Sequence, residues 1–150
     1  MITFISVGFF FVLVGAIFAL TPGLLHASRL FLQDFKLVQF PHTANIWFPA
    51  PSNPNAHLTF YNAVGLFCLI WGLFEFFILA AKFLMNLPAV SKARTMSDVI
   101  FWLGTYYLIH NFLNSSLTLS SWFTFWSMII ILSGVSLVAR AFFLALRTYI

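Results

Sequence analysis

Two charged residues lie inside long apolar stretches of the sequence, where a charge without a partner is costly. Glu75 and Arg140 each precede by seven residues a basic residue, Lys82 or Arg147, which marks one end of its helix. Seven residues of helix rise about 10 Å, so the two charges are expected at the same depth. We therefore predict a Glu75–Arg140 ion pair that fixes the register of two helices. Two other interpretations remain open: Glu75 handles a proton or a substrate, or the charges contact another subunit.

Polar side chains are also expected to gather at the end of the protein opposite Lys82 and Arg147, which we call the outer end. They follow one face of residues 98–114 or lie at the start of residues 58–85, and they are His57, Tyr61, Asn62, Tyr107, His110, Asn111 and Asn114. Polar groups in membrane helices commonly hydrogen-bond across helices, and we expect that role for this outer polar cluster.

The histidines of the outer end could instead bind a metal ion or haem, because imidazole is a ligand for copper, zinc and haem iron. The candidates are His57 and His110, with His26 or His42 as further ligands. No helix carries a pair of histidines at ligand spacing, and the single cysteine, Cys68, lies in an apolar stretch. We therefore expect no metal, no cofactor and no catalytic residue.

The composition defines the class of protein that holds these residues. Of the 150 residues, 62% are hydrophobic and 7% are charged, whereas an ordinary soluble domain has about 25% charged residues. The chain is therefore expected to be an integral membrane protein surrounded by lipids. Its 7 basic and 3 acidic residues could neutralise few phosphates, so nucleic acid is not expected as a partner.

Four apolar segments are long enough to cross a hydrocarbon layer of about 30 Å, which takes about 20 helical residues. They cover approximately residues 2–20, 58–85, 98–114 and 121–147. The predicted fold is an all-α, four-transmembrane-helix bundle that forms a single membrane domain over residues 1–150. Ser97 and Asp98 are expected to begin the third of these helices, because both side chains can accept hydrogen bonds from free backbone amides.

Three connecting segments complete this prediction. Residues 22–40 place apolar side chains at helical spacing among charged ones, which is typical of an amphipathic helix in the membrane interface. Residues 41–57 contain four prolines, which exclude a regular helix and predict an extended, Pro-rich outer loop. Residues 86–97 are expected to form a cytoplasmic loop.

The distribution of basic residues predicts the orientation of the chain. With four spans, both termini and the loop 86–97 lie on the same side of the membrane. That side holds Lys82, Lys92, Arg94 and Arg147, against Arg29 and Lys36 on the other. Because basic residues near the ends of spans are retained on the cytoplasmic side, a multi-pass protein with cytoplasmic N- and C-termini is expected.

These features favour a non-catalytic membrane subunit or scaffold over an enzyme. Its partners would be other membrane protein subunits or further copies of the chain. A continuous polar route through the membrane, as a channel or transporter requires, is not evident in the sequence. Two alternatives stay open: a small proton-coupled transporter that acts as a homodimer through Glu75, and a metal- or haem-binding subunit that uses the outer histidines.

Overall fold

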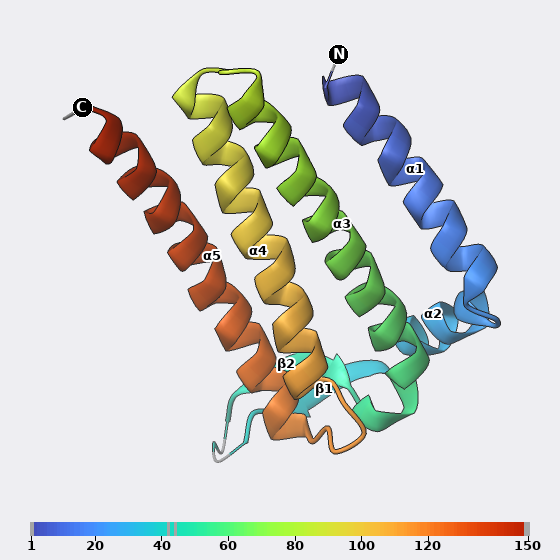
Figure 1. Ribbon diagram of the computed structural model, residues 1–150. Coiled ribbons are helices and arrows are strands. Elements are labelled where there is room, and N and C mark those ends of the chain that lie inside the picture. Colours follow the sequence, from blue (N-terminus) through green and yellow to red (C-terminus); the bar gives the residue numbers. More distant parts are fainter. Residues whose placement is uncertain (1, 42, 44, 149–150) are drawn as a thin grey trace.

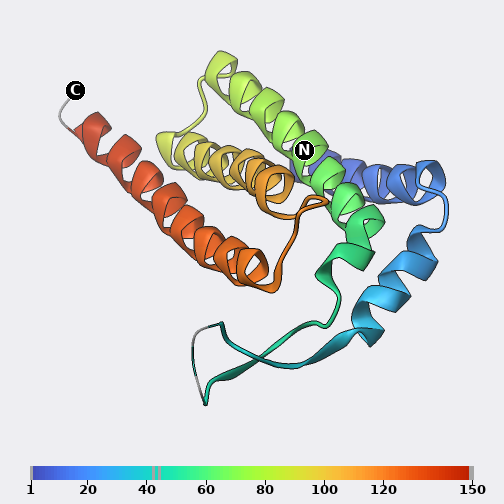
Figure 2. The same cartoon turned by 90° about the horizontal axis from the view of Figure 1, so that it is seen from below.

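The computed structural model describes residues 2–41, 43 and 45–148, and the side chains in these ranges except those of residues 2, 3, 147 and 148. Four long helices run side by side (Figure 1): α1 (Ile2–Leu20), α3 (Leu58–Leu84), α4 (Ala89–Phe112) and α5 (Leu119–Thr148). Helix α1 packs on α3, α3 on α4 and α4 on α5, so α4 lies between α3 and α5. The view from below shows the same order (Figure 2).

The two ends of the bundle differ. One end, which we call the inner end, carries the start of α1, the end of α5 and the turn between α3 and α4 (Figure 1). The outer end carries the helix α2 (Leu24–Gln33), the strands β1 (Phe35–Gln39) and β2 (Trp47–Pro51), and the short 3-10 helix η1 (Pro54–His57).

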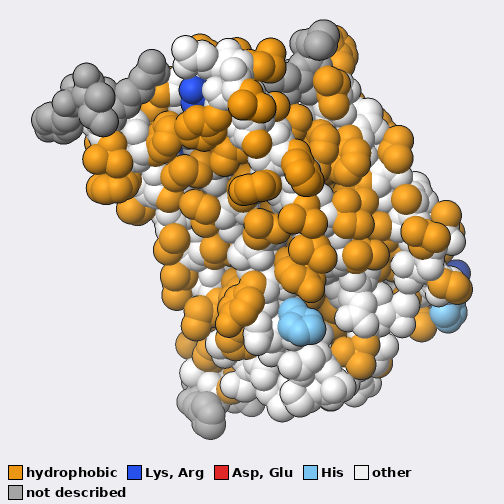
Figure 3. Space-filling model, viewed as in Figure 1, with side chains coloured by type: hydrophobic (Ala, Val, Ile, Leu, Met, Phe, Trp, Pro, Cys, Tyr) orange, Lys and Arg blue, Asp and Glu red, His pale blue; other side chains and the backbone are white. Residues whose placement is uncertain are grey.

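Length and composition support two or three membrane spans, where the sequence analysis expects four. The segments Pro54–Leu84 and Leu119–Leu146 are long and apolar enough to cross a membrane. A third span results if Phe4–Leu20 and Leu24–Gln33, which are bent by 94°, count as one. Helix α4 is not among these candidates, and it carries Asp98 in its first half and His110 and Asn111 near its end. Apolar side chains cover much of the bundle face shown in Figure 3.

Helix α4 begins nine residues earlier than predicted. The expected loop 86–97 is only a tight turn in which Asn86 has a positive φ of 49°. The backbone amides of Ser91 and Lys92 donate to the carbonyl oxygen of Pro88 at 3.0 and 3.2 Å, so the helix is already formed there. Asp98 therefore lies inside α4, and the prediction that it begins the helix is wrong. Proline suits the position before a first turn because its φ is already close to the helical value.

The segment 22–40 is likewise only partly helical. Helix α2 ends at Gln33, and the chain continues as β1, which pairs antiparallel with β2 from Phe35 opposite Pro51 to Gln39 opposite Trp47. The fold is therefore mainly helical but not all-α. Pro49 and Pro51 prevent a helix, yet they are tolerated in a two-stranded ribbon because each strand has a free edge that needs no amide donors.

Glycines set the close packing of the central helices. A Cβ added at Gly72 of α3 would lie 2.5 Å from Leu103 Cδ2 of α4, and one at Gly104 of α4 would lie 2.6 Å from Leu132 Cδ1 of α5. Small residues of this kind let membrane helices approach closely. These contacts hold α3 and α5 on opposite sides of α4.

Candidate functional site: a charged cavity and an outer clasp

A cavity of about 310 Å³ lies between α1, α3 and α4, toward the inner end. Its lining is mostly polar and includes two acidic and two basic side chains: Ser6, Glu75, Ile78, Lys82, Ser91, Arg94, Thr95 and Asp98. We call it the charged cavity. It brings Glu75, singled out from the sequence, together with three charged residues whose grouping the sequence analysis did not anticipate.

Lys82 is the best-anchored charge of the cavity. Its Nζ donates to Thr95 Oγ1 at 2.5 Å and to the carbonyl oxygen of Ser91 at 3.5 Å. Thr95 itself is buried, with 2% of its surface exposed. These contacts join the end of α3 to the start of α4 and use part of the hydrogen-bonding capacity of the ammonium group, which has three donors.

The other charges of the cavity are not paired directly. Within the described ranges, the carboxylates of Glu75 and Asp98 accept no hydrogen bond and form no ion pair within 4.0 Å, and the guanidinium of Arg94 donates none. They act on one another over longer distances: Asp98, Lys82 and Arg94 all influence Glu75 electrostatically. The four groups therefore face a shared space without closing onto each other.

The predicted ion pair between Glu75 and Arg140 is not formed in the described part of the chain. Glu75 lies on α3 and Arg140 on α5, and α4 separates these two helices. The acid on which Arg140 acts electrostatically is Asp98 of α4. The prediction placed the two charges at equal depth from their spacing to the helix ends, but it did not include the order of the helices.

At the outer end, Asp34 is surrounded by donors. Its Oδ2 accepts a hydrogen bond from the backbone amide of Asn53 at 2.8 Å and lies 2.9 Å from His57 Nε2. Its carbonyl oxygen accepts from the amide of Ser52 at 3.1 Å. These bonds tie the end of α2 to the segment that leads into α3, and we call the group Asp34, Ser52, Asn53 and His57 the outer clasp.

The outer clasp alters the acidity of Asp34. Partial burial by itself would raise the pKa of this carboxyl group, but the amide of Asn53, the imidazole of His57 and the charge of Lys36 together hold the pKa below its ordinary value. Hydrogen bonds and positive charges favour the ionised form of a carboxyl group. Asp34 is therefore a carboxylate that stabilises the fold when ionised.

Aromatic rings pack beside the clasp. Phe31 of α2 stacks on Phe60 with ring centroids 4.4 Å apart, and it meets His57, Tyr61 and Trp122 edge-on at 5.4, 5.8 and 6.1 Å. Phe31 thus joins α2 to both α3 and α5. The hydroxyl of Tyr61 is buried and has no hydrogen-bond partner among the described residues.

The structure does not gather the predicted outer polar cluster into one site. His57 and Tyr61 are buried, whereas Asn62, Tyr107, His110 and Asn111 are exposed. The amide nitrogen of Asn111 donates to the Tyr107 carbonyl oxygen of its own helix at 2.8 Å, and Asn114 binds Ser116 in the following turn. These bonds are local and do not cross between helices.

The histidines are likewise dispersed. His57 is bound to Asp34, and His110 stacks on Tyr106 with ring centroids 6.2 Å apart. No three His, Cys, Asp or Glu side chains in the described ranges are grouped so that they could hold a metal ion. His42 lies outside the described residues.

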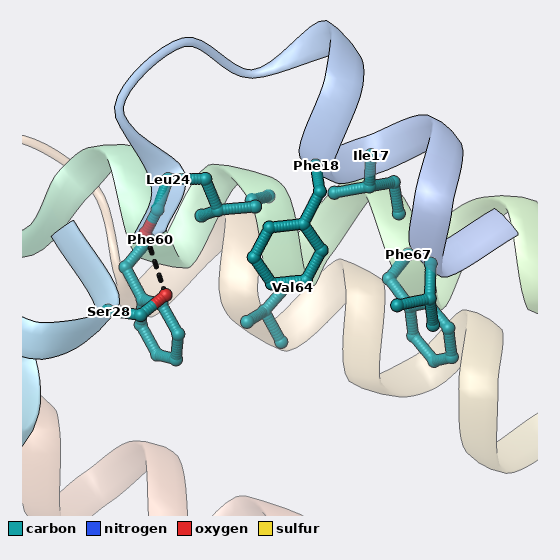
Figure 4. Close-up of a pocket in the computed structure, with 9 residues that line it drawn as sticks. Ile17, Phe18, Leu24, Ser28, Phe60, Val64 and Phe67 are labelled. Carbon is teal, nitrogen blue, oxygen red and sulfur yellow. Dashed lines mark hydrogen bonds between the residues drawn. The ribbon is translucent and has the colours of Figure 1, made fainter. Parts of the chain in front are cut away.

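A separate apolar cavity of about 160 Å³ lies where α1, α2 and α3 meet (Figure 4). The labelled side chains of Phe18, Phe60, Val64 and Phe67 border it. Ser28 is also part of the lining, but its hydroxyl donates to the carbonyl oxygen of Leu24 at 2.8 Å. The described lining thus offers apolar surface and no free charged group, unlike the charged cavity.

Comparison with known proteins adds no further assignment. The chain matches no protein-family model, no curated protein and no solved structure.

Proposed function

We propose that this chain is a non-catalytic integral membrane subunit or scaffold that assembles with other membrane proteins or with further copies of itself. In this proposal α1, α3, α4 and α5 each cross the membrane, and the short amphipathic helix α2 lies at the outer interface. The termini and the α3–α4 turn face the cytoplasm, in agreement with the basic residues at that end.

The observation that carries this proposal is the uncovered apolar surface at both edges of the helix row. Helix α5 packs mainly on α4, and only 6% of its candidate span is buried within the chain. Exposed side chains along it include Ile130, Val138 and Phe142. At the other edge, α1 exposes Phe11 and Val12. A soluble protein does not leave surfaces of this extent open, because burying apolar area is favourable.

Glycines on these edges favour protein partners in addition to lipid. A Cβ added at Gly8 or Gly15 of α1, or at Gly134 of α5, would meet no described atom within 4 Å. These glycines therefore serve no packing within the described chain. Small residues on a membrane-facing surface allow the backbone of a neighbouring helix to approach closely.

Native mass spectrometry of the protein, extracted from its own membrane in a mild detergent, tests this proposal. We expect bound membrane subunits or a homo-oligomer. Gly134→Leu should release a partner that binds α5, and Gly8→Leu one that binds α1, while each variant keeps its thermal stability because the added Cβ meets no described atom within 4 Å. A monomer without partners in the wild type would overturn the proposal.

The charged cavity favours a second candidate function, a small proton-coupled transporter. Ionisable residues in membrane segments commonly mark proton or substrate pathways, and Glu75 here lines a polar space instead of contacting a basic partner. In vesicles containing the purified protein, an imposed pH gradient should dissipate faster than in empty vesicles. Glu75→Gln should abolish this effect and Asp34→Asn should not. Equal rates for wild type and Glu75→Gln would reject this function.

A further inference from the structure

We propose that the charged cavity binds a small zwitterionic molecule, with its anionic group at Arg94 and Lys82 and its ammonium group at Asp98 and Glu75. The inference concerns binding only. It therefore stands or falls independently of whether the chain is a scaffold or a transporter.

The charges of the cavity are held apart from one another. Opposite charges that serve only to stabilise a membrane protein gain most by direct contact, because unpaired charges there are costly. Instead, Glu75, Asp98 and Arg94 surround a cavity of about 310 Å³ and make no direct ion pair or hydrogen bond within the described ranges. Groups on a bound molecule could complete these interactions.

The basic and acidic side chains also follow an order along the cavity. Lys82 contacts Ser91 and Thr95 close to the α3–α4 turn. Asp98 lies four residues further along α4 than Arg94, and Glu75 lies seven residues before Lys82 on α3. At 1.5 Å per residue, the acids thus lie about 6 and 10 Å further from the inner end than the basic residues of the same helices. The cavity is therefore positive on the side of the inner end and negative on the side that faces the outer end.

This order also decides between classes of ligand. A simple cation would leave Arg94 and Lys82 without an anionic partner, and a simple anion would leave both carboxylates without a cationic one. A zwitterion matches both groups at once, and the two acidic and two basic side chains give the cavity no net charge. The headgroup of a phosphatidylethanolamine that enters from the membrane leaflet at the inner end has the opposite order. Its ammonium group lies closer to the water than its phosphate does.

The available donors fit an anionic group at the inner end. The guanidinium of Arg94 has five N–H donors and can bind a carboxylate through two parallel hydrogen bonds. Lys82 is partly engaged by Thr95 and Ser91. We therefore assign the main anion contact to Arg94 and a supporting electrostatic role to Lys82.

Isothermal titration calorimetry of the full chain in detergent, with 4-aminobutanoate as the probe, tests this inference. The probe separates its charges by a distance comparable to the rise from Arg94 to Asp98. Butylammonium and butanoate, which each carry one of the two charges, are the matched control ligands. We expect 4-aminobutanoate to bind at least tenfold more tightly than either control.

Variants locate the site. Arg94→Gln and Asp98→Asn should each weaken binding of 4-aminobutanoate at least tenfold, and Arg94→Lys should retain part of it. Asp34→Asn, which changes an acid at the opposite end, should bind as the wild type does. Arg94 is exposed, so Arg94→Gln is expected to fold, and an unchanged thermal unfolding temperature confirms that its loss of binding is local.

Three outcomes would overturn the inference. Equal binding of butylammonium would identify a cation site made by the acids alone, and equal binding of butanoate would identify an anion site. No binding of any of the three at millimolar concentration would indicate that the charges only balance one another. None of these results depends on transport or on partner subunits, so they are distinguishable from a failure of the proposed functions.

Discussion

The carboxylates at the two ends of the bundle have opposite surroundings. At the outer end, Asp34 accepts a hydrogen bond from Asn53 and is bound to His57. Toward the inner end, Glu75 and Asp98 face an open cavity and have no such partners in the described part of the chain. Contacts that are already satisfied hold a fold together, whereas unsatisfied ones are available to a ligand. The outer clasp therefore has a structural role, and we propose a binding role for the charged cavity.

The side chains that pack around the outer clasp also differ from those that line the charged cavity. Phe31, Tyr61 and Trp122 pack closely beside the outer clasp. The lining of the charged cavity is short or polar except for Ile78. Rings that fill space leave little room for a ligand, while hydroxyl and charged side chains around a cavity retain water or a polar molecule.

The largest effect is expected from Phe31→Ala. This change removes ring contacts to α3 and α5 at once and leaves a cavity beside the outer clasp, so the free energy of unfolding should fall by about 3 kcal/mol. Thermal and denaturant unfolding in detergent measure the loss. Phe31→Leu retains more apolar volume and should cost about half as much. An unchanged stability of Phe31→Ala would show that the outer end contributes little to the fold.

Gly72→Ala should have the next largest effect. The added methyl group would approach Leu103 Cδ2 to 2.5 Å and the Leu103 backbone nitrogen to 3.2 Å, so α3 and α4 must separate. Overpacking of this kind costs about 2 kcal/mol. Gly134→Ala is the matched control, because the same methyl group there meets nothing within 4 Å. Its stability should be equal to that of the wild type or slightly higher, since alanine favours helix.

The outer clasp predicts a smaller, pH-dependent effect. Because the pKa of Asp34 is lowered in the folded chain, the unfolded chain binds more protons as the pH falls through the ordinary carboxyl range. Stability contributed by Asp34 is therefore present above that range and is lost as the pH decreases through its folded pKa. The loss should be about 1 kcal/mol, the usual net value of a hydrogen bond.

Unfolding midpoints measured between pH 6 and pH 3 test this dependence. Asp34→Asn cannot ionise, so its stability should be lower than that of the wild type at pH 6, and the difference should narrow as the pH falls below the ordinary carboxyl range. A constant difference between wild type and variant across this range would contradict the role assigned to the Asp34 carboxylate.

The sequence predicted the long helices well because apolar runs bounded by proline or polar turns leave few alternatives. Residues 58–85 became α3, which ends at Leu84, and residues 2–20 became α1. It missed β1, because the apolar spacing that suggested a helix through residue 40 continues past the residue where α2 ends. Strand pairing with a distant proline-containing segment is a tertiary effect that local periodicity does not report.

The candidate site was less predictable for a related reason. Glu75 could be selected because one acid in a long apolar run is conspicuous. Asp98 was assigned to a helix start, because the polar residues that precede it resemble a loop. Its grouping with Glu75 depends on α4 beginning at Ala89 and on α4 lying between α3 and α5. Neither the early start nor the order of the helices follows from residue spacing alone.

The smallest effect is expected from Glu75→Gln, and it is the most direct test of the comparison. Its carboxylate has no direct partner to lose within the described ranges. Removing it relieves the cost of burying a charge and the repulsion by Asp98, and it ends attraction by Lys82 and Arg94, so these contributions oppose each other. The free energy of unfolding should therefore change by less than about 0.5 kcal/mol, as for surface substitutions without specific contacts. A decrease of 2 kcal/mol or more in the free energy of unfolding would mean that Glu75, like Asp34, is a structural carboxylate. The distinction between the two ends would then fail.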